Sequence, residues 1–200
     1  MVLRWHWLGR LLGACALLAS TGAAAADSGT DSLQIDRQQS HADFSVRVMW
    51  LIPVHGRFGS VHGTIAIDRF RGSARVDALI DVADVHMRSR GDEAWVKSAE
   101  FFDAQHFPQI QFLSEPFSLS RLDKGGEVAG MLTVRGVARP ARFELEPSDC
   151  KGASGKECPV EAQGTIRRSE FGMRSRRGAL SDKVDLSFSI RVLAPPKQTP

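Results

Sequence analysis

Apolar and polar residues alternate along most of the chain between Leu33 and Leu193. The last of these runs is the most regular: its apolar members lie at every second position, and they are Val184, Leu186, Phe188, Ile190 and Val192. A period of two is typical of strands that bury one face, because successive side chains point to opposite sides of a sheet. The pattern therefore predicts an all-β domain over residues 33–193.

Short glycine-bearing segments separate the alternating runs, for example Arg71-Gly72-Ser73, 123–126 and Arg135-Gly136. Such connections join antiparallel neighbours, and about eight strands spaced in this way predict an up-and-down barrel or a sandwich. One segment differs: residues around 91–104 open with Asp92 and Glu93 among helix formers, so a short helical insertion is predicted there. The proline-rich tail 194–200 is predicted to be disordered.

The first 26 residues have the order of a secretory signal peptide. Arg4 and Arg10 precede the apolar run 11–19, and small residues lead to Ala24-Ala25-Ala26. We therefore predict cleavage near Ala26, a flexible N-terminus over 27–32, and a periplasmic or secreted protein. Lipidation at Cys15 is the alternative, but almost no apolar stretch precedes that cysteine.

Charge argues against nucleic-acid binding. The whole chain carries a formal net charge of +3. Removal of residues 1–26 leaves 24 basic and 23 acidic residues, so no domain-wide basic excess remains.

Cys150 and Cys158 are the cysteines that remain after this removal, and an exported chain with an even cysteine count is expected to pair them. The five histidines at 41, 55, 62, 86 and 106 lack metal-ligand spacing, so neither a metal nor a cofactor is expected. A nucleophile elbow is also missing from the sequence, and no catalytic role is predicted.

Four stretches, in order, resemble the YceI family. The first combines Phe44-Ser45-Val46 with Gly56-Arg57-Phe58-Gly59 and Gly63-Thr64-Ile65. The second runs from Lys97 through Phe101-Phe102-Asp103 to Phe112. The third is Leu132–Pro140, and the fourth is Ile166-Arg167-Arg168-Ser169-Glu170-Phe171-Gly172-Met173. Together they span nearly the whole exported domain.

This resemblance implies an extended eight-stranded antiparallel β-barrel, similar to lipocalins, with an apolar lumen for a polyisoprenoid or another long-chain amphiphilic lipid. Family members are often dimeric, so a homodimer is one expectation. The residues predicted to line the lumen or its mouth are Phe44, Val46, Val48, Trp50, Trp95, Phe101, Phe102, Ile110, Phe112, Leu186, Phe188 and Ile190. Ordinary core packing is the alternative for each of them, because alternation reports burial and not a cavity.

The sequence departs from the family pattern at Val48 and Trp95, where relatives often carry histidine. These residues favour the apolar chain of a ligand over its polar head. The basic segment 174–177 predicts a solvated loop, with a pyrophosphate or an anionic membrane surface as alternative partners, so at most peripheral membrane contact is expected. The remaining alternatives are an integral outer-membrane barrel, disfavoured by the absence of tyrosine, and a small secreted enzyme.

Overall fold

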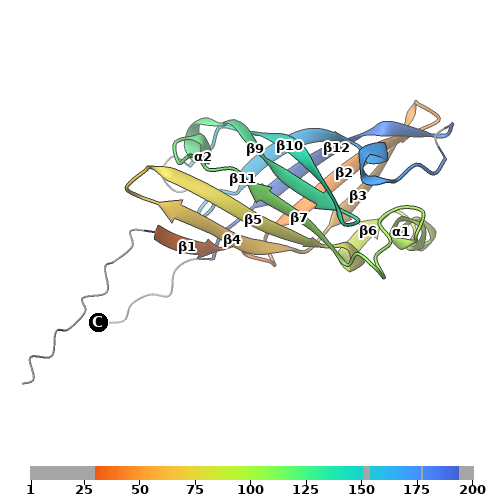
Figure 1. The fold of residues 1–200 in the computed structure, drawn as a ribbon, viewed down its shortest axis with the longest axis horizontal. Helices are drawn as coiled ribbons and strands as arrows, with labels where there is room; N and C mark the ends of the chain where they lie inside the picture. Colours follow the sequence, from red (N-terminus) through yellow and green to blue (C-terminus); the bar gives the residue numbers. More distant parts are fainter. Residues whose placement is uncertain (1–29, 151–153, 177, 194–200) are drawn as a thin grey trace, which may run out of the picture.

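The computed structural model describes residues 30–150, 154–176 and 178–193. Antiparallel strands dominate this part of the chain, with two short helices and two 3-10 turns (Figure 1). The strands are β1 (Thr30–Gln34), β2 (His41–Val48), β3 (Ile52–Phe58), β4 (Val61–Asp68), β5 (Ser73–Asp81), β6 (Val85–Met87), β7 (Gln109–Ser114), β8 (Phe117–Ser118), β9 (Gly126–Val134), β10 (Val137–Leu145), β11 (Val160–Arg167) and β12 (Leu180–Ile190). The helices are α1 (Arg90–Lys97) and α2 (Arg121–Lys124), and the 3-10 turns are η1 (Val82–Asp84) and η2 (Arg168–Phe171).

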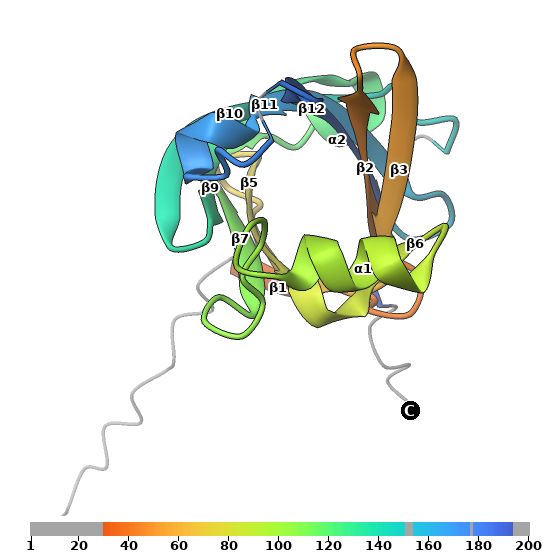
Figure 2. The same ribbon diagram turned by 90° about the vertical axis from the view of Figure 1, so that its right-hand side faces the viewer.

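The strands form a barrel in which three long strands are each broken in two. Only Gly59 and Ser60 separate β3 from β4, and η1 separates β5 from β6. β3 pairs with β6 while β4 pairs with β5, so the two broken strands form one long hairpin. The third broken strand consists of β7 and β8, which both pair antiparallel with β5. Counted as continuous strands the ring has eight members, as predicted, and Figure 2 shows it along the barrel axis.

β1 adds a short further strand at one end of the barrel. It pairs with β4, and its extension at Ile35 forms a bridge with Val192 beyond the end of β12. The Leu193 amide donates to the Gln34 carbonyl at 2.9 Å. The sequence predicted a flexible segment over 27–32, and this boundary is wrong because β1 already begins at Thr30. Regular strand alternation is absent from 30–34, so the pairing could only be seen in three dimensions.

Helix α1 lies across one end of the barrel (Figure 2). Ser89 caps it by accepting a hydrogen bond from the Asp92 amide at 3.1 Å, and Asp92, Glu93 and Lys97 suit the helix dipole. A helical insertion was predicted around residues 91–104. The structure has a helix at this place, but it ends at Lys97. After Lys97 the chain turns, with the Phe102 amide bonded to the Val96 carbonyl at 3.0 Å.

Helix α2 interrupts the alternating part of the chain. β8 ends at Ser118, and a helical turn follows it. Gly125 and Gly126 then adopt φ angles of 77° and 121°, which favour glycine. These two residues return the chain into β9.

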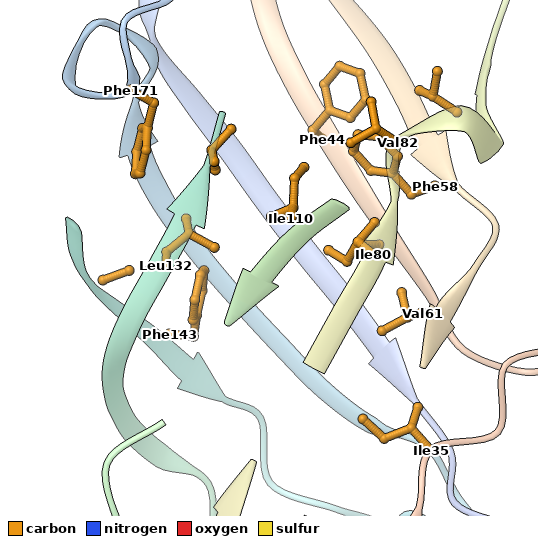
Figure 3. Close-up of a cluster of buried hydrophobic side chains, with 14 of the residues drawn as sticks. Ile35, Phe44, Phe58, Val61, Ile80, Val82, Ile110, Leu132, Phe143 and Phe171 are labelled. Carbon is orange, nitrogen blue, oxygen red and sulfur yellow. The ribbon is translucent and has the colours of Figure 1, made fainter. Parts of the chain in front are cut away.

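Apolar side chains from opposite walls meet inside the barrel (Figure 3), where they form one buried cluster. The outer surface carries polar pairs instead: the Thr165 hydroxyl donates to Asp185 at 3.0 Å, and that of Ser189 donates to Glu161 at 2.8 Å. An outer-membrane barrel has an apolar outer band, so this surface does not match that alternative. No helix in the described ranges is long and apolar enough to cross a membrane.

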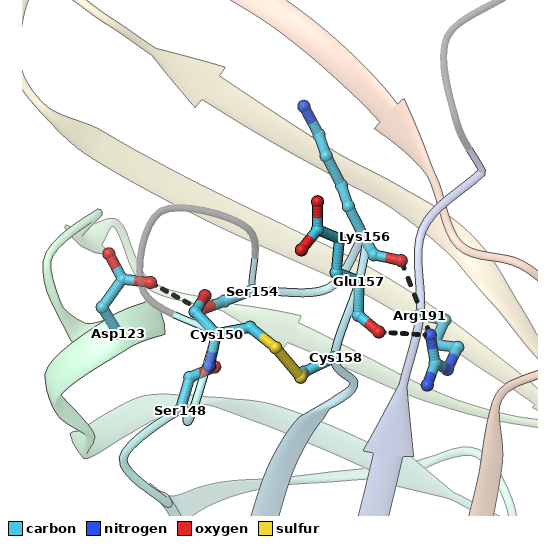
Figure 4. The surroundings of a disulfide bond; sticks show 8 residues. All are labelled: Asp123, Ser148, Cys150, Ser154, Lys156, Glu157, Cys158 and Arg191. Carbon is cyan, nitrogen blue, oxygen red and sulfur yellow. Dashed lines mark hydrogen bonds between the residues drawn. A yellow bond between two sulfur atoms is a disulfide. The ribbon is translucent and has the colours of Figure 1, made fainter.

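The predicted disulfide between Cys150 and Cys158 is confirmed (Figure 4). It lies in the β10–β11 connection, at the end of the barrel that carries α2 (Figure 1). Nearby, the Ser154 hydroxyl donates to Asp123 at 2.5 Å, and Arg191 donates to the Glu157 carbonyl at 2.9 Å. The predicted signal peptide, Cys15 and the tail 194–200 lie outside the described residues.

Candidate functional site: an apolar lumen in two compartments

The barrel encloses a cavity of about 300 Å³ at the end covered by α1. Its described lining comes from nearly every strand of the barrel and from α1. Among these lining residues only Asp43, Asp92, Arg168 and Arg176 are charged, and the others are apolar. The sequence alone does not distinguish an empty lumen from one filled by side chains. In the structure, this half of the lumen contains unfilled space.

A second, smaller cavity of about 100 Å³ lies towards the α2 end. Ile80, Leu132 and Phe188 line both cavities, so the two compartments are adjacent along the lumen. Phe143 contacts Phe112 and Phe188 edge-on, each at a ring-centroid distance of 4.9 Å. These three rings, from β10, β7 and β12, all line the smaller cavity, and Phe188 also lines the larger one. We call them the aromatic waist, because they lie where the smaller cavity adjoins the larger one through Phe188.

Most of the residues predicted for the site line one of these compartments. The larger cavity is lined by Phe44, Val46, Val48, Trp95, Phe101, Phe102, Ile110, Leu186 and Phe188. The smaller one is lined by Phe112, Ile190 and again Phe188. Trp50 lines neither, because it is 63% exposed at the tip of the β2–β3 hairpin. That the lining residues bind a ligand stays a prediction.

Strand register brings the predicted residues of β2 and β12 together. Phe44 lies opposite Leu186, and Val46 lies opposite Val184. On its other side Phe44 lies opposite Gly56 of β3, and the ring of Phe44 occupies the space that a Cβ at Gly56 would need. Glycine at position 56 therefore lets a large aromatic side chain lie flat in the wall of the larger cavity.

Contacts between α1 and the loop before β12 line one end of the larger cavity, which we call its mouth. The Trp95 ring packs edge-on against Phe101 at 4.3 Å, and its Nε1 donates to Glu100 at 2.7 Å. The guanidinium of Arg176 lies over the same ring, and the Ser175 hydroxyl donates to the Glu100 carbonyl at 3.1 Å. Trp95 is thus both a wall of the cavity and the centre of these mouth contacts.

Arg168 is a lining residue that the sequence did not single out for the site. It is only 2% exposed, and its guanidinium donates to the backbone carbonyls of Met173, Ser175, Leu180 and Ser181 at 2.7–3.2 Å. A buried charge is tolerated when its donors are satisfied. Arg168 therefore holds the loop between η2 and β12 against the barrel end.

Asp182 lies beside this arginine and accepts two hydrogen bonds from Ser169, at 2.9 Å from the amide and 2.8 Å from the hydroxyl. Burial by itself would raise the pKa of Asp182. The hydrogen bonds from Ser169 and the positive charges of Arg168 and Arg167 outweigh burial, so the pKa is lowered from its ordinary value. The carboxylate stays ionised and fixes η2 against the start of β12.

The other lining residues that the prediction omitted share a signal that was present in the sequence. Leu132, Val134 and Val184 belong to alternating runs, and Phe58, Ile166 and Met173 belong to the family-like stretches. Arg168 belongs to the same family-like stretch as Ile166 and Met173, but its charge did not indicate burial, because a charged residue after a strand is usually exposed.

Metal binding finds no support in the described ranges, where no group of three or more His, Cys, Asp or Glu side chains is placed to hold an ion.

Comparison with known proteins decides the family. The model of the YceI-like domain matches residues 33–192, which is almost the whole barrel. The chain belongs to the YceI-like family. A UPF0312 protein of Enterobacter sp. (strain 638) is 30% identical over 196 residues, covering 90% of this chain and 95% of the relative.

Solved structures share the YceI-like fold. BcnA of Burkholderia cenocepacia superposes with a TM-score of 0.62 at 21% identity, covering 80% of this chain and 99% of that one. A polyisoprenoid binding domain from Saccharophagus degradans superposes with a TM-score of 0.60 at 14% identity, covering 82% and 98%. At these identities the likeness establishes the fold alone.

The motif Arg168-Ser169 to Phe171-Gly172-Met173 of this YceI-like chain is structural. Phe171 and Met173 are 1% and 3% exposed, and Gly172 adopts a φ of 79° between them. The motif turns the chain from β11 to β12, and with Arg168 and Met173 it contributes two residues to the wall of the larger cavity.

Proposed function

We propose that the chain is an exported binding protein that holds a polyisoprenoid or another long-chain amphiphilic lipid inside the barrel. The observation that carries the proposal is the larger cavity, about 300 Å³ of space with mainly apolar walls. This volume is at the lower end of the range for small-molecule sites. The polyisoprenoid binding domain with the same fold supports the choice of ligand class.

An apolar chain gains about 0.8 kcal/mol for each methylene that leaves water. Since ordering of the chain offsets part of this gain, a ligand needs many methylenes inside the barrel to bind tightly. The larger compartment takes the first part of such a chain. A longer chain has to pass the aromatic waist of Phe112, Phe143 and Phe188, so side-chain rotation at the waist would set the longest chain that binds.

We place the polar head of the ligand at the mouth, where Asp92 and Arg176 are the charged residues of the wall. Val48 and Trp95, at positions where relatives often have histidine, offer the head no titratable partner there. Affinity in this chain would therefore depend on the apolar tail more than on the head.

Export into the periplasm or the medium is part of the proposal. The basic, apolar and small-residue order of residues 1–26 supports it, and so does a disulfide of the kind that persists in oxidising compartments. A binding role of this kind needs no catalytic group and no cofactor.

Lipid identification tests the function. The exported protein is purified without detergent, and bound lipids are measured by native mass spectrometry and by extraction. We expect a prenyl or other long-chain lipid at up to one per barrel. A barrel free of lipid that also takes up no added prenyl alcohol or fatty amide would refute the proposal.

A matched pair of variants on one strand locates the site. Leu186→Trp adds bulk to the wall of the larger cavity, whereas Ser187→Trp adds the same ring to the exposed outer face of β12. We expect the first variant to lose bound lipid and the second to retain it. Equal retention by both would place the lipid outside the lumen.

A further inference from the structure

Four consecutive apolar residues form the tip of the β2–β3 hairpin and are largely exposed. Met49, Trp50, Leu51 and Ile52 are 61%, 63%, 84% and 61% exposed. Single exposed apolar residues are common on protein surfaces, but a contiguous group usually marks a contact surface. We call these four residues the apolar tip.

The backbone conformation of the turn is unfavourable for bulky residues. Met49 and Trp50 have φ angles of 50° and 66°, and the Leu51 amide donates to the Val48 carbonyl at 3.2 Å. This is a tight turn whose two central residues are left-handed, a geometry that favours Asn-Gly. Bulky apolar residues at these positions lower the free energy of unfolding, and they bury little apolar area within the fold. They are therefore expected to contribute to a contact with another surface.

The tip also projects beyond the barrel. β3 pairs with β6 only through Gly56, Arg57 and Phe58, so the segment 52–55 extends past the end of that partner. Figures 1 and 2 show the β2–β3 hairpin standing out from the same end of the barrel as α1. The mouth of the larger cavity and the apolar tip are therefore at one end of the molecule.

Positive charge lies next to the tip. The Met49 amide donates to the Ala179 carbonyl at 2.7 Å, which joins the tip to the loop before β12. In the described parts of segments 47–54 and 174–180, the charged residues are Arg47, Arg174 and Arg176. The acidic Asp182, which lines a pocket with Trp50, lies beside the buried charge of Arg168. Arg174 and Arg176 are exposed. An apolar projection with arginines around it complements an anionic lipid surface.

We propose that this end of the barrel docks on a bilayer containing anionic phospholipids. The apolar tip enters the boundary between headgroups and acyl chains, a depth that suits Trp50, and the arginines meet phosphates. Docking in this pose turns the mouth of the larger cavity towards the membrane. The proposal does not depend on which molecule fills the lumen.

A second copy of the chain is a poorer occupant. A standard protein interface buries about 800 Å² on each partner, usually over a broad surface. Four residues at a projecting turn form a wedge, and like-charged arginines beside it would face each other across a symmetric contact.

Vesicle binding tests the proposal. The exported form, residues 27–200, holds every described element and is incubated with vesicles of phosphatidylethanolamine and phosphatidylglycerol or of phosphatidylcholine alone. We expect sedimentation with the anionic vesicles, weaker at high salt.

The paired substitutions Trp50→Ser and Leu51→Ser should reduce partitioning roughly tenfold or more, and Arg174→Gln roughly fivefold. The control is Phe70→Ser, since Phe70 is 87% exposed in the β4–β5 turn at the other end.

Trp50 supplies a direct readout. Trp50 and Trp95 are the tryptophans after residue 26, so Trp95→Phe leaves Trp50 as the reporter. Its emission should shift to the blue on adding anionic vesicles. Three results would overturn the proposal: no sedimentation of the unaltered protein, the same loss with Phe70→Ser as at the tip, or a tip variant that only converts a dimer to a monomer.

Discussion

The guanidinium carbon of Arg176 lies 4.6 Å from the centroid of the Trp95 ring, above the wall of the larger cavity. The same guanidinium lies 3.9 Å from the Glu100 carboxylate, which also accepts the Trp95 indole N–H. The three side chains tie α1 and the segment after it to the loop before β12. A ligand leaving through this mouth has to part them.

Arg176→Ala is therefore expected to speed ligand release. An exposed cation–π contact is worth about 0.5–1 kcal/mol, which corresponds to a two- to fivefold faster dissociation of a bound fluorescent prenyl lipid. Arg174→Ala is the control, because Arg174 is exposed in the same loop and is not part of the Trp95 contact. Unchanged release in Arg176→Ala would mean that the ligand leaves by another route.

The aromatic waist predicts a limit on chain length. Phe143→Leu removes the ring that contacts both Phe112 and Phe188 in the wall of the smaller cavity, so this compartment should enlarge and longer chains should bind. The length distribution of bound lipids, measured by mass spectrometry, checks this. Phe171→Leu is the matched control: Phe171 is 1% exposed and lines neither cavity. Both variants lose stability on the order of 1–2 kcal/mol, but only the first should lengthen the bound chain.

Gly56→Ala tests the contact beneath Phe44. The added methyl would overlap the Phe44 ring, so the ring must move into the cavity. Overpacking of this kind lowers the free energy of unfolding by about 1–3 kcal/mol. Gly91→Ala serves as control, since its Cβ would meet only the Ser89 hydroxyl at 3.8 Å within α1, and alanine favours helix. Urea unfolding should show a loss for Gly56→Ala alone, and equal midpoints would refute the overlap.

Alternation predicted the barrel and most of its lining because it reports which face of each strand is buried. Phe44, Leu186 and Phe188 were identified in this way. The division of the lumen could not be predicted, since the waist depends on how far Phe143 reaches from β10 towards β7 and β12. Alternation along single strands carries no information on distances across a barrel.

Arg168 lines the larger cavity although the prediction omitted it, and Trp50 lines neither compartment although it was predicted for the site. Arg168 is buried because four backbone carbonyls accept its hydrogen bonds, and that arrangement exists only once the loop before β12 has folded. Trp50 was predicted to lie near the mouth of the lumen, yet it is 63% exposed in a tight turn between β2 and β3. Residue type predicts burial well only where the backbone is regular.

The disulfide predicts a separation between stability and binding. Replacing both Cys150 and Cys158 by serine opens a short loop and should lower the free energy of unfolding by about 2–3 kcal/mol. The bond lies at the α2 end, away from the larger cavity, so lipid affinity should stay the same. Urea unfolding and lipid titration of the same preparation check the two parts. A variant with unchanged stability and weakened lipid binding would contradict both parts of the prediction.

Asp182 predicts how the barrel responds to acid. Its pKa is lower in the folded chain than the usual value near 3.9, so ionised Asp182 stabilises the fold. This stabilisation is fully present above the unfolded pKa and is lost as the pH falls through the folded pKa.

Asp182→Asn should therefore be less stable than the unaltered protein at pH 7, and the difference should shrink below about pH 4. Urea midpoints at pH 7, 5, 4 and 3 measure it. Ser169→Ala is the companion variant, because it removes the hydroxyl donor and should reproduce part of the same pH dependence. A difference of constant size at every pH would contradict the lowered pKa, because neither the Ser169 hydrogen bonds nor the charge of Arg168 would then favour the ionised carboxylate.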